Sequence, residues 1–307
     1  MLDEFIRYIE AERRYSPLTV RNYRRDAERF MAWWSATLAQ GAPFDPCEVS
    51  ADDIREWIIH RTEKEHIAAR AMNRELSTLR TLYRWLRSTG RVQKDIMQAV
   101  PSLRASRRLP AFVPESRMTQ IVDECETPAD DFAEERNALI ILLFYSCGLR
   151  LSELIGLDRD DFSAASATLR VRGKGDKERV VPLLAEAVAK IEAHIARIER
   201  QNICRTPEKA LFLSDSGRRI SRSTVYRLVR KELAQADVQG KKSPHVLRHT
   251  FATHLMNGGA DMREIQELMG HATLQATQVY THNSIAHLQR VYAKAHPRAR
   301  DGENEQP

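Results

Sequence analysis

Six side chains spread between positions 150 and 280 are suited to chemistry on a phosphate ester. In chain order they are Arg150, Lys174, His245, Arg248, His271 and Tyr280. Arginines can bind the non-bridging oxygens of a phosphate bidentately, which the point charge of a lysine does less well. A histidine can donate a further hydrogen bond, and a lysine can protonate a departing 5′ oxygen. The tyrosine hydroxyl is a candidate nucleophile if nearby groups ease its ionisation, since its reference pKa is about 10.

Together these residues fit an in-line attack on a phosphodiester. Negative charge then builds on the non-bridging oxygens of a five-coordinate phosphorus, and catalysis rests mostly on positioning and charge stabilisation. His245 and His249 have the spacing of zinc ligands, but no Glu follows the first histidine and an arginine on the same face would repel a cation. We therefore expect no metal and no cofactor, because the required cations belong to the chain itself.

Both arginines are expected near the beginning of helices. Arg150 follows Gly148, the glycine that ends an apolar segment, and lies beside the start of the next helix. Ser243 and the proline after it form an N-cap and a first helical position. His245 and Arg248 then lie three residues apart and share one face of that helix.

Lys174 and His271 are expected at turns. Leu169 and Val171 alternate with arginines before a Gly-Lys-Gly-Asp turn, and the apolar pattern resumes at Val180, which is the signature of a β-hairpin. A lysine between two glycines can reach a phosphate, and no Walker A pattern is present to indicate ATP binding. His271 directly follows a glycine that caps the end of a helix.

Helical patterns dominate the first hundred residues. Apolar stripes at helical spacing, a helix start at Ser16 and a capping box of Ser50 with Asp53 predict four helices. The opposite faces carry arginines, although a charged helix face is usually just solvated. The periodicity then stops at a basic linker, placed at 105–114, and a second domain of helices with one hairpin follows. The predicted fold class is mainly α with a small β-element.

Composition narrows the class of protein further. A chain of 307 residues suggests two domains, and a net charge of +6 permits a nucleic-acid partner without establishing one. The longest apolar run, 138–145, is far shorter than the ~20 residues of a membrane span, and the first residues lack a signal-peptide pattern. The four cysteines form no C-x-x-C pair and read as reduced thiols. We expect a cytoplasmic protein without membrane insertion.

The order of the six residues resembles the catalytic signature of the tyrosine site-specific recombinases. The resemblance runs through nearly the whole chain. SPLTVRNYRRD is similar to the family's core-binding domain, GLRLSELIGL to its first arginine box, GKGDKERVVPL to its lysine hairpin and HVLRHTFATHLMNGG to its second box. The ending YTH…HLQRVYAKAHPRA is similar to the Xer group of the family. Cys147 departs from the pattern, in which Thr or Ala is more usual.

This resemblance implies a site-specific DNA recombinase that resolves chromosome dimers at a terminus site during cell division. Tyr280 would form a 3′-phosphotyrosine intermediate, assisted by the other five residues. The implied domains are a SAM-like core-binding domain at 1–104, the linker at 105–114, an α+β catalytic domain at 115–297 and a polar tail at 298–307. The implied partners are double-stranded DNA with a dif-like site, a XerD-like recombinase in a heterotetramer and an FtsK-like translocase.

Alternatives remain open at this stage. An integrase of a mobile element commonly carries an arm-binding domain first, whereas the first helix here is expected almost at Met1. A non-catalytic DNA-binding relative would have no reason to keep all six residues, and a metal-dependent transposase would need an acidic triad.

The apolar stripe from Ile285 to Ala295 either packs on its own domain or, as the resemblance implies, docks into a neighbouring protomer.

Overall fold

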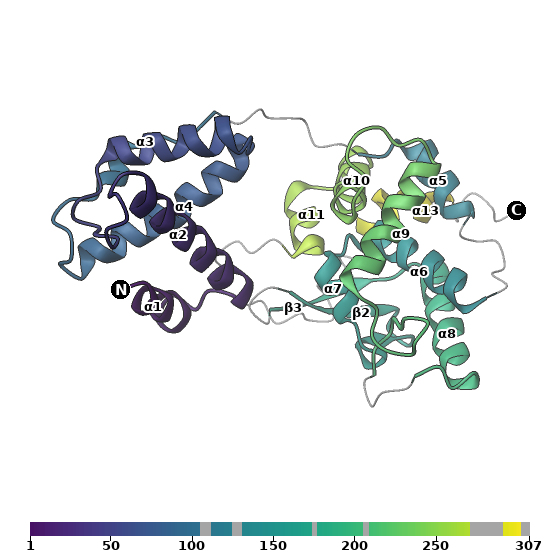
Figure 1. Cartoon of the computed structure of the whole chain (residues 1–307). Coiled ribbons are helices and arrows are strands. Elements are labelled where there is room, and N and C mark those ends of the chain that lie inside the picture. Colours follow the sequence, from purple (N-terminus) through teal and green to yellow (C-terminus); the bar gives the residue numbers. More distant parts are fainter. Residues whose placement is uncertain (105–111, 125–130, 174–176, 205–208, 271–290, 302–307) are drawn as a thin grey trace, which may run out of the picture. The chain divides into compact units, whose positions relative to one another are not determined.

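A computed structural model describes residues 1–104, 112–124, 131–173, 177–204, 209–270 and 291–301. The chain divides into two units, Met1–Arg108 and Leu109–Pro307, each with its own hydrophobic core (Figure 1). Within the described ranges, no helix is both long and apolar enough to cross a membrane. The architecture is mainly helical with one small sheet, as the sequence predicts.

Residues 1–104 fold into the four predicted helices. They are α1 (Leu2–Arg7), α2 (Pro17–Thr37), α3 (Ala51–Ile59) and α4 (Ala69–Ser88) (Figure 1). The Ser16 hydroxyl accepts a hydrogen bond from a backbone amide three residues on, and Ser50 and Asp53 form the predicted capping box. The apolar stripes of α2, α3 and α4 supply most of the core of this unit.

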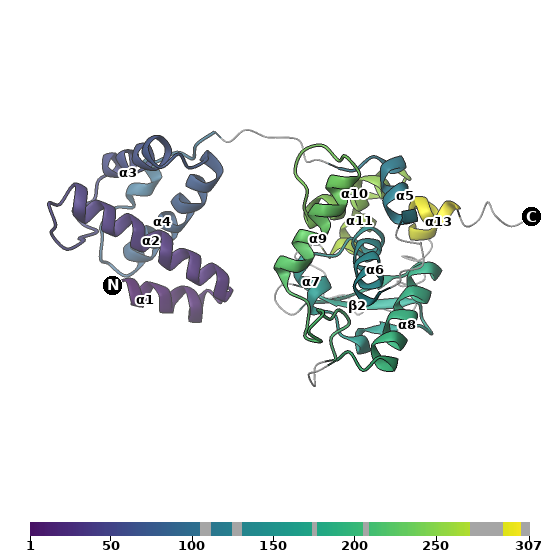
Figure 2. The same ribbon diagram turned by 45° about the vertical axis from the view of Figure 1, so that its right-hand side comes forward.

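The C-terminal unit is built around one buried helix. Its described helices are α5 (Glu115–Glu124), α6 (Phe132–Cys147), α7 (Leu151–Gly156), α8 (Ala185–Arg200), α9 (Arg222–Gln235), α10 (Pro244–Asn257), α11 (Met262–Met269) and α13 (Pro297–Asp301). Helix α6 contacts α5, α7, α8, α9 and α10, and it lies at the centre of the unit (Figure 2). Its residues 139–145 are all buried, since a helix that is apolar all round needs neighbours on every side.

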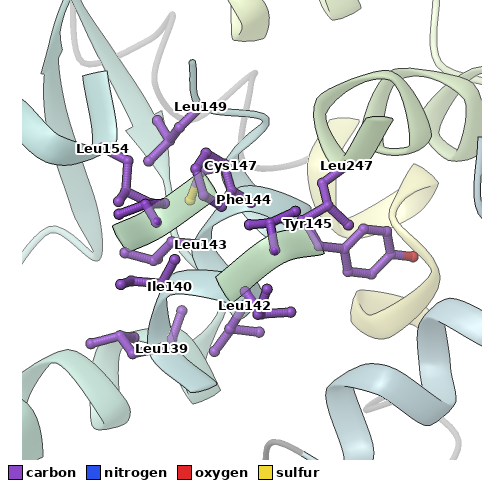
Figure 3. Packing of buried hydrophobic residues seen from close by; sticks show 14 of the residues in the cluster. Leu139, Ile140, Leu142, Leu143, Phe144, Tyr145, Cys147, Leu149, Leu154 and Leu247 are labelled. Atoms are coloured by element: carbon purple, nitrogen blue, oxygen red, sulfur yellow. The ribbon is translucent and has the colours of Figure 1, made fainter. Parts of the chain in front are cut away.

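Packing of α6 fixes the neighbouring helices that carry the predicted arginines. Leu139, Leu143 and Phe144 of α6 belong to one core cluster with Leu154 of α7 and Leu247 of α10 (Figure 3). The first arginine precedes α7 and the second follows Leu247 directly. The two helix starts are therefore held by the same core.

The predicted hairpin is present and is part of an antiparallel sheet. The strands are β1 (Phe162–Ser163), β2 (Thr168–Arg172) and β3 (Glu178–Pro182), in the order β1-β2-β3. Leu169 pairs with Val181, and Arg172 pairs with Glu178 at the last described pair before the turn. The apolar side chains of β2 are buried and its arginines are exposed, which confirms the alternation. Strand β1 was not predicted, because two residues are too short for a periodic signal.

The first residues of the expected polar tail at 298–307 are helical. Helix α13 continues from Pro297 to Asp301. Arg298 forms ion pairs with Asp123 at 2.6 Å and with Glu186 at 3.1 Å. Both partners lie more than a hundred residues earlier in the chain, so the local polar composition could not reveal them.

The helical residues 291–295 pack on their own unit. Tyr292 and Ala295 are buried in a cluster with Phe251, and the Tyr292 hydroxyl donates a hydrogen bond to the Ser146 carbonyl at 2.6 Å. The described part of the last stripe thus packs as the alternative of a final helix on its own domain predicts. Ile285 lies outside the described residues.

Candidate active site

The described residues include three of the six predicted site residues, Arg150, His245 and Arg248. The structure brings the two arginines into contact with one carboxylate, that of Glu153. His245 lies one turn before Arg248 in α10 and is exposed to solvent. The other three, Lys174, His271 and Tyr280, lie outside the described residues.

Arg150 is the N-cap residue of α7, as predicted. Its backbone amide donates to Glu153 Oε2 at 2.8 Å, and its Nη1 donates to Glu153 Oε1 at 2.6 Å. Its Nη2 donates to the Gly270 carbonyl at 3.3 Å. The side chain is nevertheless 33% exposed. The guanidinium is therefore oriented by the protein and still accessible to a ligand.

Arg248 is buried between two chain segments. Its Nη1 donates to the Gly148 carbonyl, and its Nη2 donates to the Met269 carbonyl at 2.6 Å. Gly148 ends α6 with a φ of +57°, and a Cβ atom there would lie 2.4 Å from Phe251 Cδ1. Only glycine fits this turn, because both the backbone conformation and the neighbouring ring exclude a side chain.

The start of α10 differs from its prediction in one respect. Pro244 occupies the first helical position and Ser243 the N-cap position, as expected. The Ser243 side chain makes no capping hydrogen bond, however, and its buried hydroxyl has no partner among the described residues. The extended backbone before the proline and the packing of α10 on α6 are sufficient to begin the helix.

Glu153 is the centre of a charged cluster, which it forms with Arg150, Arg179 and Arg248. Its side chain is 1% exposed, and besides Arg150 it contacts Arg179 Nη2 at 2.9 Å and Arg248 Nη1 at 3.8 Å. Burial alone would raise the pKa of this carboxyl, but the hydrogen bond and charge of Arg179 and the hydrogen bonds from Arg150 lower its pKa to about 2. The carboxylate is therefore ionised throughout the physiological pH range.

Three successive carbonyls at the end of α11 complete the cluster. In order, the carbonyls of Leu268, Met269 and Gly270 accept hydrogen bonds from Arg179, Arg248 and Arg150, at 2.9, 2.6 and 3.3 Å. The last carbonyls of a helix lack partners within the helix and lie at its negative end, so guanidinium groups suit them. The chain immediately before His271 is fixed in this way by three cations.

The arrangement can stabilise a developing negative charge. Three arginines surround one carboxylate, so the cluster carries a net positive charge in a largely buried setting. Burial, together with the positive charge of Arg150, lowers the pKa of Arg248 to about 10. Arg248 remains charged at neutral pH, where an added anion would relieve the repulsion between the arginines. In the described part of the chain, no group of three or more His, Cys, Asp and Glu side chains could hold a metal ion.

Two residues of the site, Glu153 and Arg179, are not among those predicted from the sequence. Glu153 had a local signal, since an acid three residues after an N-cap position is typical of a capping box. Arg179 had none, because its partners come from positions 153 and 268, far from it in the sequence.

Comparisons with known proteins agree over both units. Residues 111–287 match the phage integrase family, and residues 2–90 match the phage integrase N-terminal SAM-like domain. The chain is 37% identical to tyrosine recombinase XerC of Thermodesulfovibrio yellowstonii, over 98% of each chain. It is 33% identical to XerC of Chlorobaculum parvum, over 97% of this chain and 94% of that protein. These names agree with the Xer-like ending of the sequence.

Solved structures share the fold. XerH recombinase bound to a palindromic difH substrate matches with a TM-score of 0.70 and 18% identity, over 99% of this chain and 84% of that chain. The Tn1549 transposon integrase matches with a TM-score of 0.66 and 18% identity, over 99% of both chains. The family matches and the similarity to curated recombinases over nearly the whole length assign the chain. It belongs to the phage integrase family and is a tyrosine recombinase.

Proposed function

We propose that this tyrosine recombinase resolves chromosome dimers at a terminus site during cell division. The observation that carries the proposal is the similarity to XerC over nearly the whole chain, at 33–37% identity. The described arginine cluster supports the chemistry, because it presents oriented cations to an anionic group. The reaction would take place in the cytoplasm, where the chromosome lies.

The roles of the site residues form part of this proposal. Arg150 and Arg248 bind the non-bridging oxygens of the scissile phosphate, while His245 and His271 donate further hydrogen bonds. The Tyr280 hydroxyl releases its proton to solvent, its oxygen attacks phosphorus, and the bond to the 5′ oxygen breaks. Because the phosphotyrosyl bond replaces the phosphodiester, the strand can be rejoined without ATP.

The leaving oxygen needs a proton, and Lys174 supplies it in this scheme. A general acid at the tip of a hairpin can reach the 5′ side of the phosphate while the arginines hold its other oxygens. The 5′ hydroxyl so formed later attacks the phosphotyrosine, either from the same strand or from a partner duplex. No metal ion takes part in this scheme.

The assembly we propose has four parts in each chain. Residues 1–104 form the core-binding domain, which binds DNA, and residues 105–114 form a basic linker. Residues 115–297 form the catalytic domain, and residues 298–307 form a polar tail. Double-stranded DNA with a dif-like site is the substrate, a XerD-like recombinase completes the heterotetramer, and an FtsK-like translocase activates it. The similarity of the relatives to this chain in both units supports a shared arrangement.

Cleavage of suicide duplexes tests this function. Nicked duplexes that tile the replication terminus of the source organism, and others that span the ends of its mobile elements, are incubated with the protein, alone and with each candidate partner recombinase. A covalent complex on one terminus segment, strengthened by one partner, is the expected result. Cleavage confined to the ends of a mobile element would instead assign an integrase, and binding without cleavage would assign a non-catalytic relative.

A further inference from the structure

Arg179 lies outside the six predicted residues, yet it joins three elements of the cluster. It belongs to β3 and is only 4% exposed. Its Nη2 donates to Glu153 Oε2 at 2.9 Å, and its Nε donates to the Leu268 carbonyl at 2.9 Å. A single guanidinium therefore ties β3, close to the hairpin turn, to α7 and to the end of α11.

Gly270 allows this close approach. It caps α11 with a φ of +63°, and a Cβ atom there would lie 2.9 Å from Arg179 Cδ and 3.0 Å from Arg179 Nη1. The Gly270 carbonyl also accepts from Arg150. The bare backbone at this position thus lets Arg179 pack on one side and Arg150 bond on the other.

The planar guanidinium of Arg179 is one of two groups that hold the Glu153 carboxylate. Arg150 binds both oxygens, Oε1 through Nη1 and Oε2 through its backbone amide, and Arg179 binds Oε2 from β3. Without Arg179 the carboxylate keeps its two bonds to Arg150 but loses its link through Arg179 to the Leu268 carbonyl, so Glu153 and the Arg150 guanidinium can shift together relative to the end of α11. A lysine cannot replace this guanidinium, since its single nitrogen cannot donate to both Glu153 and the Leu268 carbonyl while the side chain fills the same space.

We propose that Arg179 is a positioning residue for DNA cleavage: by fixing Glu153 against the end of α11, it orients the Arg150 guanidinium toward the scissile phosphate. This inference rests on the proposed cleavage of DNA by this chain. It assigns Arg179 no contact with the substrate. Its effect on the reaction passes through Glu153 and Arg150.

The test compares Arg179→Lys with a matched control, Arg136→Lys, in the full chain. Arg136 is also 4% exposed and also donates to a carbonyl and a carboxylate, those of Leu213 at 2.9 Å and Asp215 at 2.8 Å. Each variant loses a buried guanidinium, but only the Arg179 guanidinium contacts Glu153. Thermal melts establish that each variant is folded.

Two suicide duplexes separate positioning from stability. Both span the terminus segment that the wild-type protein binds most tightly. One carries the normal phosphodiester, and the other carries a methylphosphonate, in which a methyl group replaces one non-bridging oxygen and removes the negative charge. An arginine oriented toward that charge has much less to contribute on the neutral linkage.

We expect Arg179→Lys to slow single-turnover cleavage of the phosphodiester by about 10- to 100-fold, as expected for misplaced charge stabilisation. On the methylphosphonate it should stay within about threefold of wild type, and its DNA affinity should be unchanged. Arg136→Lys should affect both duplexes alike. If Arg179→Lys does not fold, Arg179→Gln is measured in the same way.

Equal defects of Arg179→Lys on both duplexes, or no defect on either, overturn the proposal. Failure of both Arg179 variants to fold assigns the residue to stability alone and overturns it as well. If wild type and Arg136→Lys both bind but cleave neither duplex, the proposed function itself has failed. That result is distinguishable, because it does not depend on position 179.

Discussion

Replacing Glu153 with glutamine should destabilise the C-terminal unit and leave the N-terminal unit unchanged. The amide has nearly the same volume as the carboxylate but carries no charge. Arg179 and Arg248 would then remain buried without their counter-ion. Removing one partner of a buried ion pair is strongly destabilising for this reason.

The pKa of Glu153 gives the size of the effect. The folded protein holds this pKa at about 2, against a reference value of 4.5. At ~1.4 kcal/mol per pKa unit, the folded state favours the charged carboxylate by roughly 3 kcal/mol. A folded unit of this size loses roughly 2–4 °C in Tm per kcal/mol, so the variant should melt roughly 6–12 °C lower.

The sign of the pH dependence follows from the same shift. Because the folded pKa is lowered, the stabilisation is fully present above a pH of about 4.5. It is lost as the pH falls toward about 2. The difference in Tm between wild type and Glu153→Gln should therefore be constant from neutral pH to about pH 5 and should shrink below that.

The chain offers a convenient assay for each unit. All four tryptophans, at positions 33, 34, 57 and 85, lie in the N-terminal unit. Tryptophan fluorescence reports the melting of that unit alone, whereas calorimetry reports both. The control is Glu178→Gln, since Glu178 is half exposed and its ion pair with Arg172 at 3.1 Å is worth at most ~1 kcal/mol.

Two results would refute this reasoning. One is a calorimetric transition of the C-terminal unit that shifts no more in Glu153→Gln than in Glu178→Gln. The other is an equal shift in the tryptophan signal, which would mean that the substitution acts on the whole chain. Either would show that the carboxylate charge does not hold the cluster together.

Three further experiments, one of them with a control variant, have expected outcomes. Gly148→Ala should lower the free energy of unfolding of the C-terminal unit by more than ~2 kcal/mol and slow cleavage, because the new methyl group would collide with Phe251. The control is Gly259→Ala, at a φ of +88° with open space around it, which should cost only about 1 kcal/mol in thermal melts. Lys174→Ala should cleave poorly, but a substrate with sulfur in place of the 5′ oxygen should restore most of the rate, since thiolate leaves without a proton; equal defects on both substrates would argue for positioning. Arg298→Ala should lower the free energy of unfolding of the C-terminal unit by about 1 kcal/mol and leave the melting temperature seen by tryptophan fluorescence unchanged. An unchanged free energy of unfolding would show that the ion pairs of Arg298 contribute nothing to stability.

Local signals were sufficient to predict several elements of both units. The capping box at Ser50, the alternation in β2 and the glycine cap at Gly270 depend on neighbours within a few residues, and the structure contains all three. The residue types of Arg150 and Arg248 likewise pointed to anion chemistry before any fold was known. Periodicity and turn chemistry are readable because they depend on short stretches of chain.

Long-range contacts were not readable in the same way. The bond from Arg179 to the Leu268 carbonyl and the bond from Arg248 to the Gly148 carbonyl join segments about ninety and a hundred residues apart. The ion pairs of Arg298 are longer-range still. A pattern of residue types does not encode which helix end will face which strand, so these contacts required the structure.

The most direct test of the account is recovery of a covalent adduct on Tyr280. Wild-type protein is incubated with a suicide duplex in EDTA, the complex is digested with trypsin, and the DNA-linked peptide is sequenced by mass spectrometry. We predict one adduct, a 3′-phosphoryl group on Tyr280, formed without divalent metal. It should be absent from Tyr280→Phe, which should still bind the duplex with nearly unchanged affinity. An adduct on any other residue, an adduct in Tyr280→Phe, or cleavage that needs a metal ion and leaves no protein on the DNA would contradict this prediction.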